Sequence, residues 1–187
     1  MNTSTIVIIM IVGILLLLAF YVIGVYNKLV NARNKVDNQF SQVDVQLKRR
    51  ADLIPNLVET VKGYAKHEEG TLTAVIEARN KAVNAGSVNE KIDANNQLTG
   101  ALNKLFALSE AYPELKANTN FMSLQNDLKD TEDKITYARQ FYNDSAMSFN
   151  NLVEMFPSNI VASIFKFKKY EFFKALEEEK EVPKVKF

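Results

Sequence analysis

The chain has 187 residues, enough for a membrane anchor and, at most, one ordinary domain. Its 23 Lys and Arg residues nearly balance its 22 Asp and Glu residues, which argues against nucleic acid as a partner, because phosphate binding requires a basic face. The absence of cysteine excludes a disulfide framework, a thiolate nucleophile and a cysteine-based metal site, and the scarcity of Gly (6) and Pro (4) favours an all-α protein of long helices.

The first expected element is a transmembrane helix over residues 6–26, after a short extracytoplasmic N-terminus over residues 1–5. The helix would hold only apolar residues, glycines and tyrosines, and its length of roughly 31 Å matches a hydrocarbon core of about 30 Å. Lys28, Arg33 and Lys35 follow this span, whereas no positive side chain precedes it. The positive-inside rule therefore predicts a single-pass protein of the bacterial cell membrane with its C-terminal domain in the cytoplasm.

An antiparallel helical bundle is expected over residues 27–157. From Val36 to Tyr64 apolar residues recur mostly at alternating steps of four and three, the spacing of a coiled-coil seam. The membrane helix should therefore continue, through a kink at Pro55, as the first arm of the bundle. A capping box and a change of phase break the second arm near Gly86.

Two packings of these arms remain open. Arms over residues 28–66, 71–112 and 118–156 have similar lengths, which favours three antiparallel passes and a C-terminus far from the membrane. The alternative is a four-helix bundle, in which residues 71–86 and 88–112 form a separate hairpin. Four passes would bring the C-terminus back to the membrane.

Arg50 falls on the apolar seam of the first arm, where a buried guanidinium would need a charged partner. By their height along the three-arm bundle, Glu90 and Glu132 are the candidate partners. The expected role is a structural ion pair that fixes the register of the arms, rather than the binding of a ligand.

The C-terminal region, residues 158–187, is expected to hold an aromatic and basic helical segment and a flexible tail. Its aromatics and lysines alternate as Phe165, Lys166, Phe167, Lys168, Lys169, Tyr170, Phe172 and Phe173. These aromatics could close the end of the bundle core. Alternatively, the segment could form a surface for lipid or for a partner protein.

The sequence predicts no catalytic, cofactor-binding or metal-binding residues. His67 is the single histidine and falls in an expected turn, and no glycine-rich phosphate loop is present. An unrecognised enzyme would have to depend on carboxylates, with Glu59, Glu110 and Glu132 as the residues to inspect.

Four blocks of the sequence resemble the signature of the LemA family. The longest covers residues 42–64 and reads QVDVQLKRRADLIPNLVETVKGY. The other blocks are residues 110–118 (EAYPELKAN), Thr131-Glu132 with Ile135, Ala138 and Arg139, and Tyr142-Asn143 with Phe149-Asn150. The resemblance implies a bacterial membrane protein with a cytoplasmic helical bundle, no established enzymatic activity and no accepted catalytic residues. The family that the chain resembles also has a relative in magnetosome-forming bacteria, and that relative is linked to shaping an internal membrane.

The expected function is that of a non-enzymatic, membrane-anchored scaffold or adaptor. It would act through self-association or through protein partners at the membrane, with the lipid bilayer itself contacted through residues 6–26. The alternatives are a membrane-remodelling or lipid-contacting module and an unrecognised enzyme.

Overall fold

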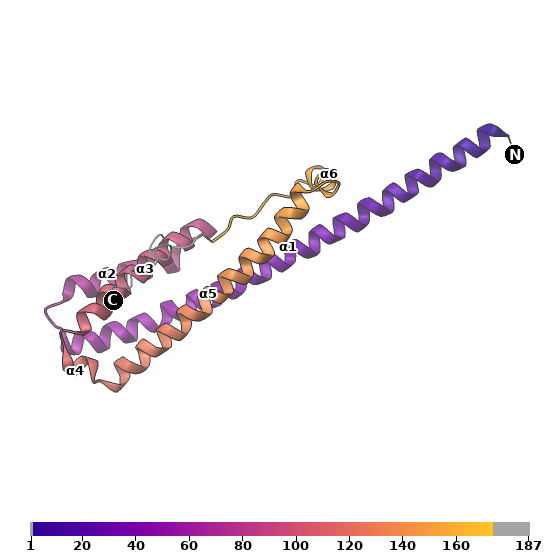
Figure 1. The fold of residues 1–187 in the computed structure, drawn as a ribbon. Coiled ribbons are helices and arrows are strands. Elements are labelled where there is room, and N and C mark those ends of the chain that lie inside the picture. The colour runs from indigo at the N-terminus through magenta and orange to yellow at the C-terminus, as the bar shows by residue number, and fades with distance from the viewer. Residues whose placement is uncertain (1, 174–187) are drawn as a thin grey trace, which may run out of the picture. The chain divides into compact units, whose positions relative to one another are not determined.

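The protein is all-α, as the composition predicted (Figure 1). The computed structural model describes residues 2–173, and no strand occurs among them. The helices are α1 (Thr3–Tyr64), α2 (Glu69–Asn84), α3 (Val88–Ser109), α4 (Pro113–Lys116), α5 (Thr119–Glu154) and α6 (Ser158–Ile164). The chain divides into two compact units, and the boundary between them falls inside both α1 and α5. Unit 1 contains residues up to Gln39 together with Phe141–Phe172, and unit 2 contains Phe40–Gln140 together with Phe173.

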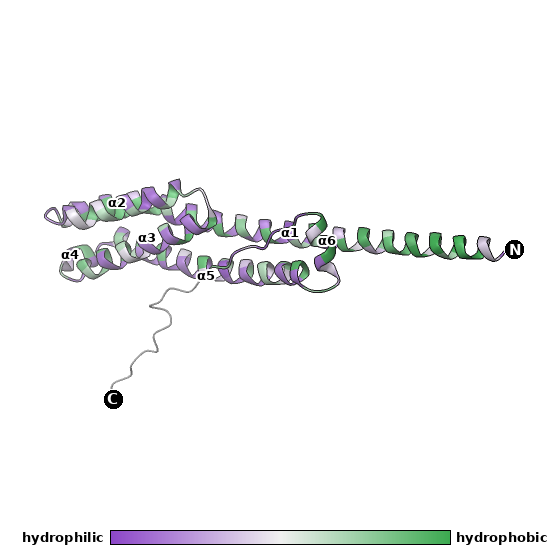
Figure 2. Cartoon of the chain, turned by 90° about the horizontal axis from the view of Figure 1, so that it is seen from above, coloured by the Kyte–Doolittle hydropathy of each residue, from purple (hydrophilic) through white to green (hydrophobic). Residues whose placement is uncertain are grey.

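In the described part of the chain, α1 is the helix that is long and apolar enough to cross a membrane. Its apolar window is entirely unburied, and Figure 2 shows this stretch as continuously hydrophobic. The same helix then continues without a break through Pro55 to Tyr64, because apolar residues at helical spacing follow the span directly. These features support association with a membrane.

Unit 2 contains the larger hydrophobic core. Its central side chains come from α1, α3 and α5 and include Ile54, Leu57, Leu98, Leu105 and Phe121, none of them more than 1% exposed. The α2 helix adds Leu72 and Val75 to the same core. Burial of side chains of this size contributes about 1.5–3 kcal/mol each, so the core decides which helix faces turn inward.

Helices α2 and α3 pack against each other as a hairpin rather than forming one long arm (Figure 1). The chain reverses because Ala85 is extended (φ −63°, ψ 123°) and ends α2. Ser87 then begins α3 with a capping box, and the Gly86 N–H donates to Glu90 Oε2 at 2.9 Å. Of the two packings that the sequence left open, the four-helix alternative describes unit 2. The similar lengths of the arms favoured three passes, but arm length does not reveal that the chain reverses over the three residues between α2 and α3.

Unit 1 combines the N-terminal part of α1 with the end of α5, with α6 and with an extended segment, residues 166–172, that we call the strap. Leu29 and Val36 of α1 and Tyr142, Ala146 and Phe149 of α5 are buried here. The strap contacts both helices through its aromatic side chains and backbone. It runs back along unit 1 instead of extending the helix, so α6 is the helical part of the C-terminal segment among residues 158–173, and the predicted flexible tail lies outside the described residues.

Candidate functional site

The most buried ionic group of unit 2 is the guanidinium of Arg50, which is 4% exposed. Its Nη2 lies 2.8 Å from Glu132 Oε2, and its Nη1 donates to Asn95 Oδ1 at 2.8 Å. Burial lowers the pKa of Arg50 below its ordinary value, the Glu132 carboxylate raises it, and Arg139 lowers it further. The group joins three helices, α1, α3 and α5, at one level of the bundle, and such a pair fixes the register of its helices.

Glu90, the other acidic residue expected near Arg50, lies elsewhere. Its carboxylate accepts hydrogen bonds from the Gly86 and Ser87 backbone N–H groups, at 2.9 and 3.1 Å, and these bonds lower its pKa. A carboxylate that caps the start of α3 is not available to a guanidinium one to two helical turns away. The Asn95 side chain occupies the position on α3 that faces Arg50.

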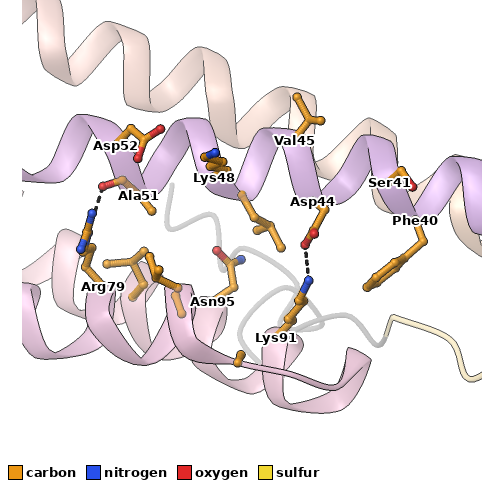
Figure 3. A pocket seen from close by; sticks show the side chains of 15 residues that line it. Phe40, Ser41, Asp44, Val45, Lys48, Ala51, Asp52, Arg79, Lys91 and Asn95 are labelled. Atoms are coloured by element: carbon orange, nitrogen blue, oxygen red, sulfur yellow. Dashed lines mark hydrogen bonds and ion pairs between the residues drawn. The ribbon is translucent and has the colours of Figure 1, made fainter.

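A cleft of about 500 Å³ opens between α1, α2 and α3 of unit 2 (Figure 3). Its lining is mainly apolar, and Val45 and Val83 at its rim are 57% and 53% exposed. The cleft forms where the α2–α3 hairpin turns, because the side chains at this end of the hairpin are too small to fill the space beside α1. Ala82, Ala85 and Ala51 line it there.

Of the five charged side chains that line this cleft, Asp44, Lys91 and Arg79 are engaged by other groups of the protein, whereas Lys48 and Asp52 form no ion pair among the described residues. Lys91 Nζ lies 2.5 Å from Asp44 Oδ1 and 5.2 Å from the centre of the Phe40 ring. The Arg79 Nε–H donates to the Ala51 carbonyl oxygen at 3.3 Å (Figure 3). The small apolar side chains of the lining suit the docking of an apolar side chain or a short helix more than they suit acid–base chemistry.

The carboxylates that an enzyme would have required do not converge. Glu110 pairs with Lys116 at 2.6 Å on an exposed surface, and Glu132 pairs with Arg50. Glu59 lines a separate, open depression beside Asn120 and Ser123. Among residues 2–173, no group of three or more His, Asp or Glu side chains is arranged to hold a metal ion.

Tyr170 holds the strap of unit 1 in place. Its backbone N–H donates to Asn150 Oδ1 and its carbonyl oxygen accepts from Asn150 Nδ2, both at 2.9 Å, so one side chain pairs with the strap as a neighbouring strand would. The Tyr170 hydroxyl donates to Asp37 of α1. The Tyr142 hydroxyl donates to the Glu171 carbonyl oxygen at 3.0 Å.

These contacts raise the pKa of both tyrosines. Burial raises the pKa of Tyr142 to about 12, and the nearby Asp37 and Glu171 carboxylates add to the effect. The pKa of Tyr170 is also raised, first by burial and then by the hydrogen bond to Asp37. The neutral phenols are therefore part of the structure that holds the strap.

The structure divides the aromatic and basic segment into inward and outward side chains. Phe167 packs against Phe149 at 6.1 Å between ring centres and lies under the Arg33 guanidinium. In unit 2, Phe173 is 7% exposed, stacks on Phe40 and contacts Arg139. Phe165 and Phe172 remain 48% and 43% exposed. Of the lysines, Lys169 pairs with Glu154 at 2.5 Å, whereas Lys166 and Lys168 are exposed.

Next to this segment lies a cluster of exposed apolar residues, of which Phe165 alone was predicted from the sequence as part of a contact surface. It consists of Met155, Phe156, Ile160, Ile164 and Phe165, and we call it the apolar tip. A signal was present, because residues 155–165 contain no charged side chain in a chain that is otherwise 24% charged. The alternation of aromatics and lysines further along drew the prediction to the strap instead.

Comparison with known proteins finds relatives among LemA and magnetosome proteins. A model of the LemA family matches residues 39–187. Protein LemA of Metamycoplasma hominis is 29% identical over 150 residues, which cover 76% of this chain and 66% of that protein. Magnetosome protein MamQ of Magnetospirillum gryphiswaldense is 26% identical over 174 residues, which cover 79% of this chain and 64% of that protein. Magnetosome protein MamQ 2 of Paramagnetospirillum magneticum is 25% identical over 192 residues, which cover 88% and 71%.

The chain spans slightly less than two thirds of the first two relatives, and the names of these relatives refer to no catalysed reaction. The family match begins at Gln39, where α1 passes from unit 1 to unit 2, and includes Arg50, Glu132, the cleft and the strap. Since the match extends over far more than half of the sequence, and the blocks that resembled the LemA signature lie inside it, this chain belongs to the LemA family.

Proposed function

We propose that the protein is a non-enzymatic scaffold or adaptor, anchored in the cytoplasmic membrane by residues 6–26 and acting through self-association or protein partners. One observation carries the proposal. The helix that contains the apolar span also supplies Leu29, Val36, Val43 and Leu57 to the buried core, with no linker between them. A helix shared in this way suits an anchored scaffold better than an enzyme on a flexible tether.

The cleft of unit 2 is the proposed contact site for a partner. Its exposed valines, Val45 and Val83, flank an apolar floor, and its Lys91 is paired with Asp44. A partner could bury apolar side chains there.

Photo-crosslinking in native membranes tests this proposal. A photoreactive amino acid at Val83 should yield a larger crosslinked species, either a dimer or a complex with another protein. Ile76 is the matched control, because it lies two turns earlier on α2, is 42% exposed and does not line the cleft. Recovery of monomer alone from Val83, or equal products from both positions, would contradict the proposal.

The orientation with the bundle in the cytoplasm is part of the same proposal. It is supported by Lys28, Arg33 and Lys35, which follow the span without positive charges before it. Protease added outside intact spheroplasts should leave the bundle uncleaved until the membrane is broken. Cleavage before lysis would reverse the orientation.

Membrane remodelling is a second candidate function. The observation that favours it is the apolar tip of unit 1, where Phe156 is 80% exposed. Reconstitution of the full chain into liposomes should then reduce the diameter of the vesicles or change their shape, as seen by electron cryomicroscopy. Vesicles that keep the size of those carrying an unrelated single-span protein would argue against this function.

A further inference from the structure

The apolar tip is exposed to an unusual degree for a water-soluble surface. Its five members are Met155 (63% exposed), Phe156 (80%), Ile160 (52%), Ile164 (64%) and Phe165 (48%). They follow one another through the turn after α5, through α6 and to its C-cap, Phe165. Contiguous exposed apolar side chains of this kind mark a contact with a protein or a membrane.

Helix α6 is apolar on both of its faces. Val161 and Ala162 are 2% and 1% exposed and pack inward. Ile160 and Ile164, one helical turn apart, point outward. A surface helix in water normally turns a charged or polar face outward, whereas α6 has no charged residue and exposes two isoleucines beside Ser163, which favours an apolar surrounding on its outer side.

The tip lies beside the end of the membrane span. Within unit 1, the Phe165 ring lies 4.7 Å from the Tyr26 ring, and the Phe167 ring lies 6.0 Å from it. Tyr26 is the last residue of the apolar stretch, and Figure 2 shows α6 next to the point on α1 where the continuous hydrophobic colour begins. The outward residues of α6 are thus at the depth where the span leaves the hydrocarbon.

Basic residues follow the tip directly. Lys166 and Lys168 are exposed, and Arg33 of α1 lies over the Phe167 ring, on the side of Tyr26 away from the span. Aromatic and aliphatic residues bordered by lysines match the order of an interface, with acyl chains first and phosphate headgroups next. A protein partner would not require the apolar residues to lie next to the span and the lysines to lie beyond them.

We infer that the apolar tip is a second membrane contact, which inserts into the boundary between headgroups and acyl chains of the leaflet in which the span ends. The ligand is the bilayer, with Phe156 as the most deeply placed side chain and Lys166 and Lys168 at the phosphates. This inference rests on the membrane anchoring proposed above and gives the second candidate function its lipid-binding surface. It replaces the strap, whose Phe167 is turned inward, as the lipid-facing part of the C-terminal region.

Site-specific fluorescence tests the contact directly. Because the chain contains no cysteine, Phe156→Cys and Ile164→Cys each create a single site for an environment-sensitive nitrobenzoxadiazole label. The labelled full chain is reconstituted in phosphatidylglycerol and phosphatidylethanolamine liposomes. Met122→Cys, an apolar position of unit 2 that is 43% exposed, is the matched control.

We expect labels at residues 156 and 164 to emit at shorter wavelength than the label at 122. Doxyl-labelled lipids should quench both several-fold more strongly than they quench the control, whereas aqueous iodide should favour the control. Equal iodide access at all three positions would overturn the inference. A blue shift without lipid quenching, rising with the protein-to-lipid ratio, would also overturn it and identify a second copy as the occupant.

Two further measurements, far-UV circular dichroism and vesicle shape, distinguish a loss of folding from a change of function. Unchanged far-UV circular dichroism confirms that each variant is folded, as the outward position of both side chains predicts. Lipid quenching in vesicles of unchanged shape would uphold the membrane contact while removing remodelling as its function. Reshaped vesicles without lipid quenching would overturn the membrane contact of the apolar tip while upholding remodelling as a function.

Discussion

Arg50 and Glu132 stand out at the scale of the single residue because the cost of burying a guanidinium sets what must surround it. Arg50 is 4% exposed, whereas Glu132 is 34% exposed, so the pair is open to water on the acidic side. The ion pair with Glu132 and the hydrogen bond to Asn95 offset part of the loss of hydration, while Arg50 Nε is buried without a hydrogen-bond partner. Loss of either partner leaves the cation buried without full compensation.

Glu132→Gln should therefore lower the free energy of unfolding by about 1–3 kcal/mol. The control is Asp130→Asn on the same helix. It breaks an exposed pair with Lys134 (46% and 52% exposed) and should cost no more than about 0.5 kcal/mol. Urea titration of the full chain in detergent micelles, followed by far-UV circular dichroism, measures both. Equal effects of the two substitutions would show that the buried pair has no special role.

Tyr142 predicts a loss of stability at alkaline pH. Its pKa is about 12 in the folded protein and 10.0 when unperturbed, so the unfolded chain loses this proton first. The folded state then binds more protons, and the free energy of unfolding falls as the pH rises between about 10 and 12. Tyr142→Phe should flatten this dependence relative to the original chain, in urea titrations between pH 9 and 11.

The control for that experiment is Tyr137→Phe, since Tyr137 lies on the same helix and is 62% exposed. It should keep the alkaline slope of the original chain. Comparison of slopes rather than absolute stabilities removes the contribution of lysines, which lose their protons over the same range. An unchanged slope in Tyr142→Phe would contradict the prediction.

At the scale of the element, the strap depends on side chains rather than on its own backbone. It is extended and has no neighbouring strand among the described residues, so Asn150 supplies the donor and acceptor that a strand would provide. The chain needs such a contact because an unpaired, partly buried backbone group is costly.

Asn150→Ala should release the strap and make the backbone beside its exposed lysines accessible to trypsin. Two hydrogen bonds are lost, each contributing about 0.5–1.5 kcal/mol, so cleavage after Lys168 and Lys169 should accelerate by an order of magnitude or more. The neighbouring Asn151 is exposed and gives the matched control, Asn151→Ala. Identical proteolysis rates in both variants would mean that other contacts hold the strap.

At the scale of the whole molecule, the apolar span and the first arm of the bundle are parts of one helix, α1. Helix α5 likewise contributes to both compact units. Neither helix is interrupted by a glycine-rich or proline-rich linker at the unit boundary. A partner bound to the bundle is therefore connected to the bilayer by continuous helical backbone, which is stiffer than a flexible tether.

A seven-residue Gly-Ser insertion between Asn27 and Lys28 should uncouple this connection. The helical content of the bundle should persist, because its buried core begins at Leu29, after the insertion. The crosslinks formed from Val83 in native membranes should weaken. A seven-residue helix-forming insertion preserves the helical phase, since seven residues complete about two turns, and should retain them. Full crosslinking with the Gly-Ser insertion would show that a continuous helix is unnecessary.

Local sequence determined most of the secondary structure of this protein. Helical spacing and the capping box near Gly86 predicted the helices and the break between α2 and α3, because each depends on residues three or four positions apart. The apolar span is equally local, since it requires only length and the absence of charge. The all-α class and the family membership were therefore predictable from the sequence.

Contacts between distant residues could be decided only by the tertiary structure. Periodicity placed Arg50 on a buried face, but Glu90 and Glu132 could be distinguished only once α2 and α3 were seen to fold as a hairpin. The same reversal allows the chain to return, so that Phe165 meets Tyr26 across 139 positions of the sequence (165 − 26). Whether an aromatic ring faces the core or the bilayer depends on what packs behind it, and no local pattern of residues contains that information.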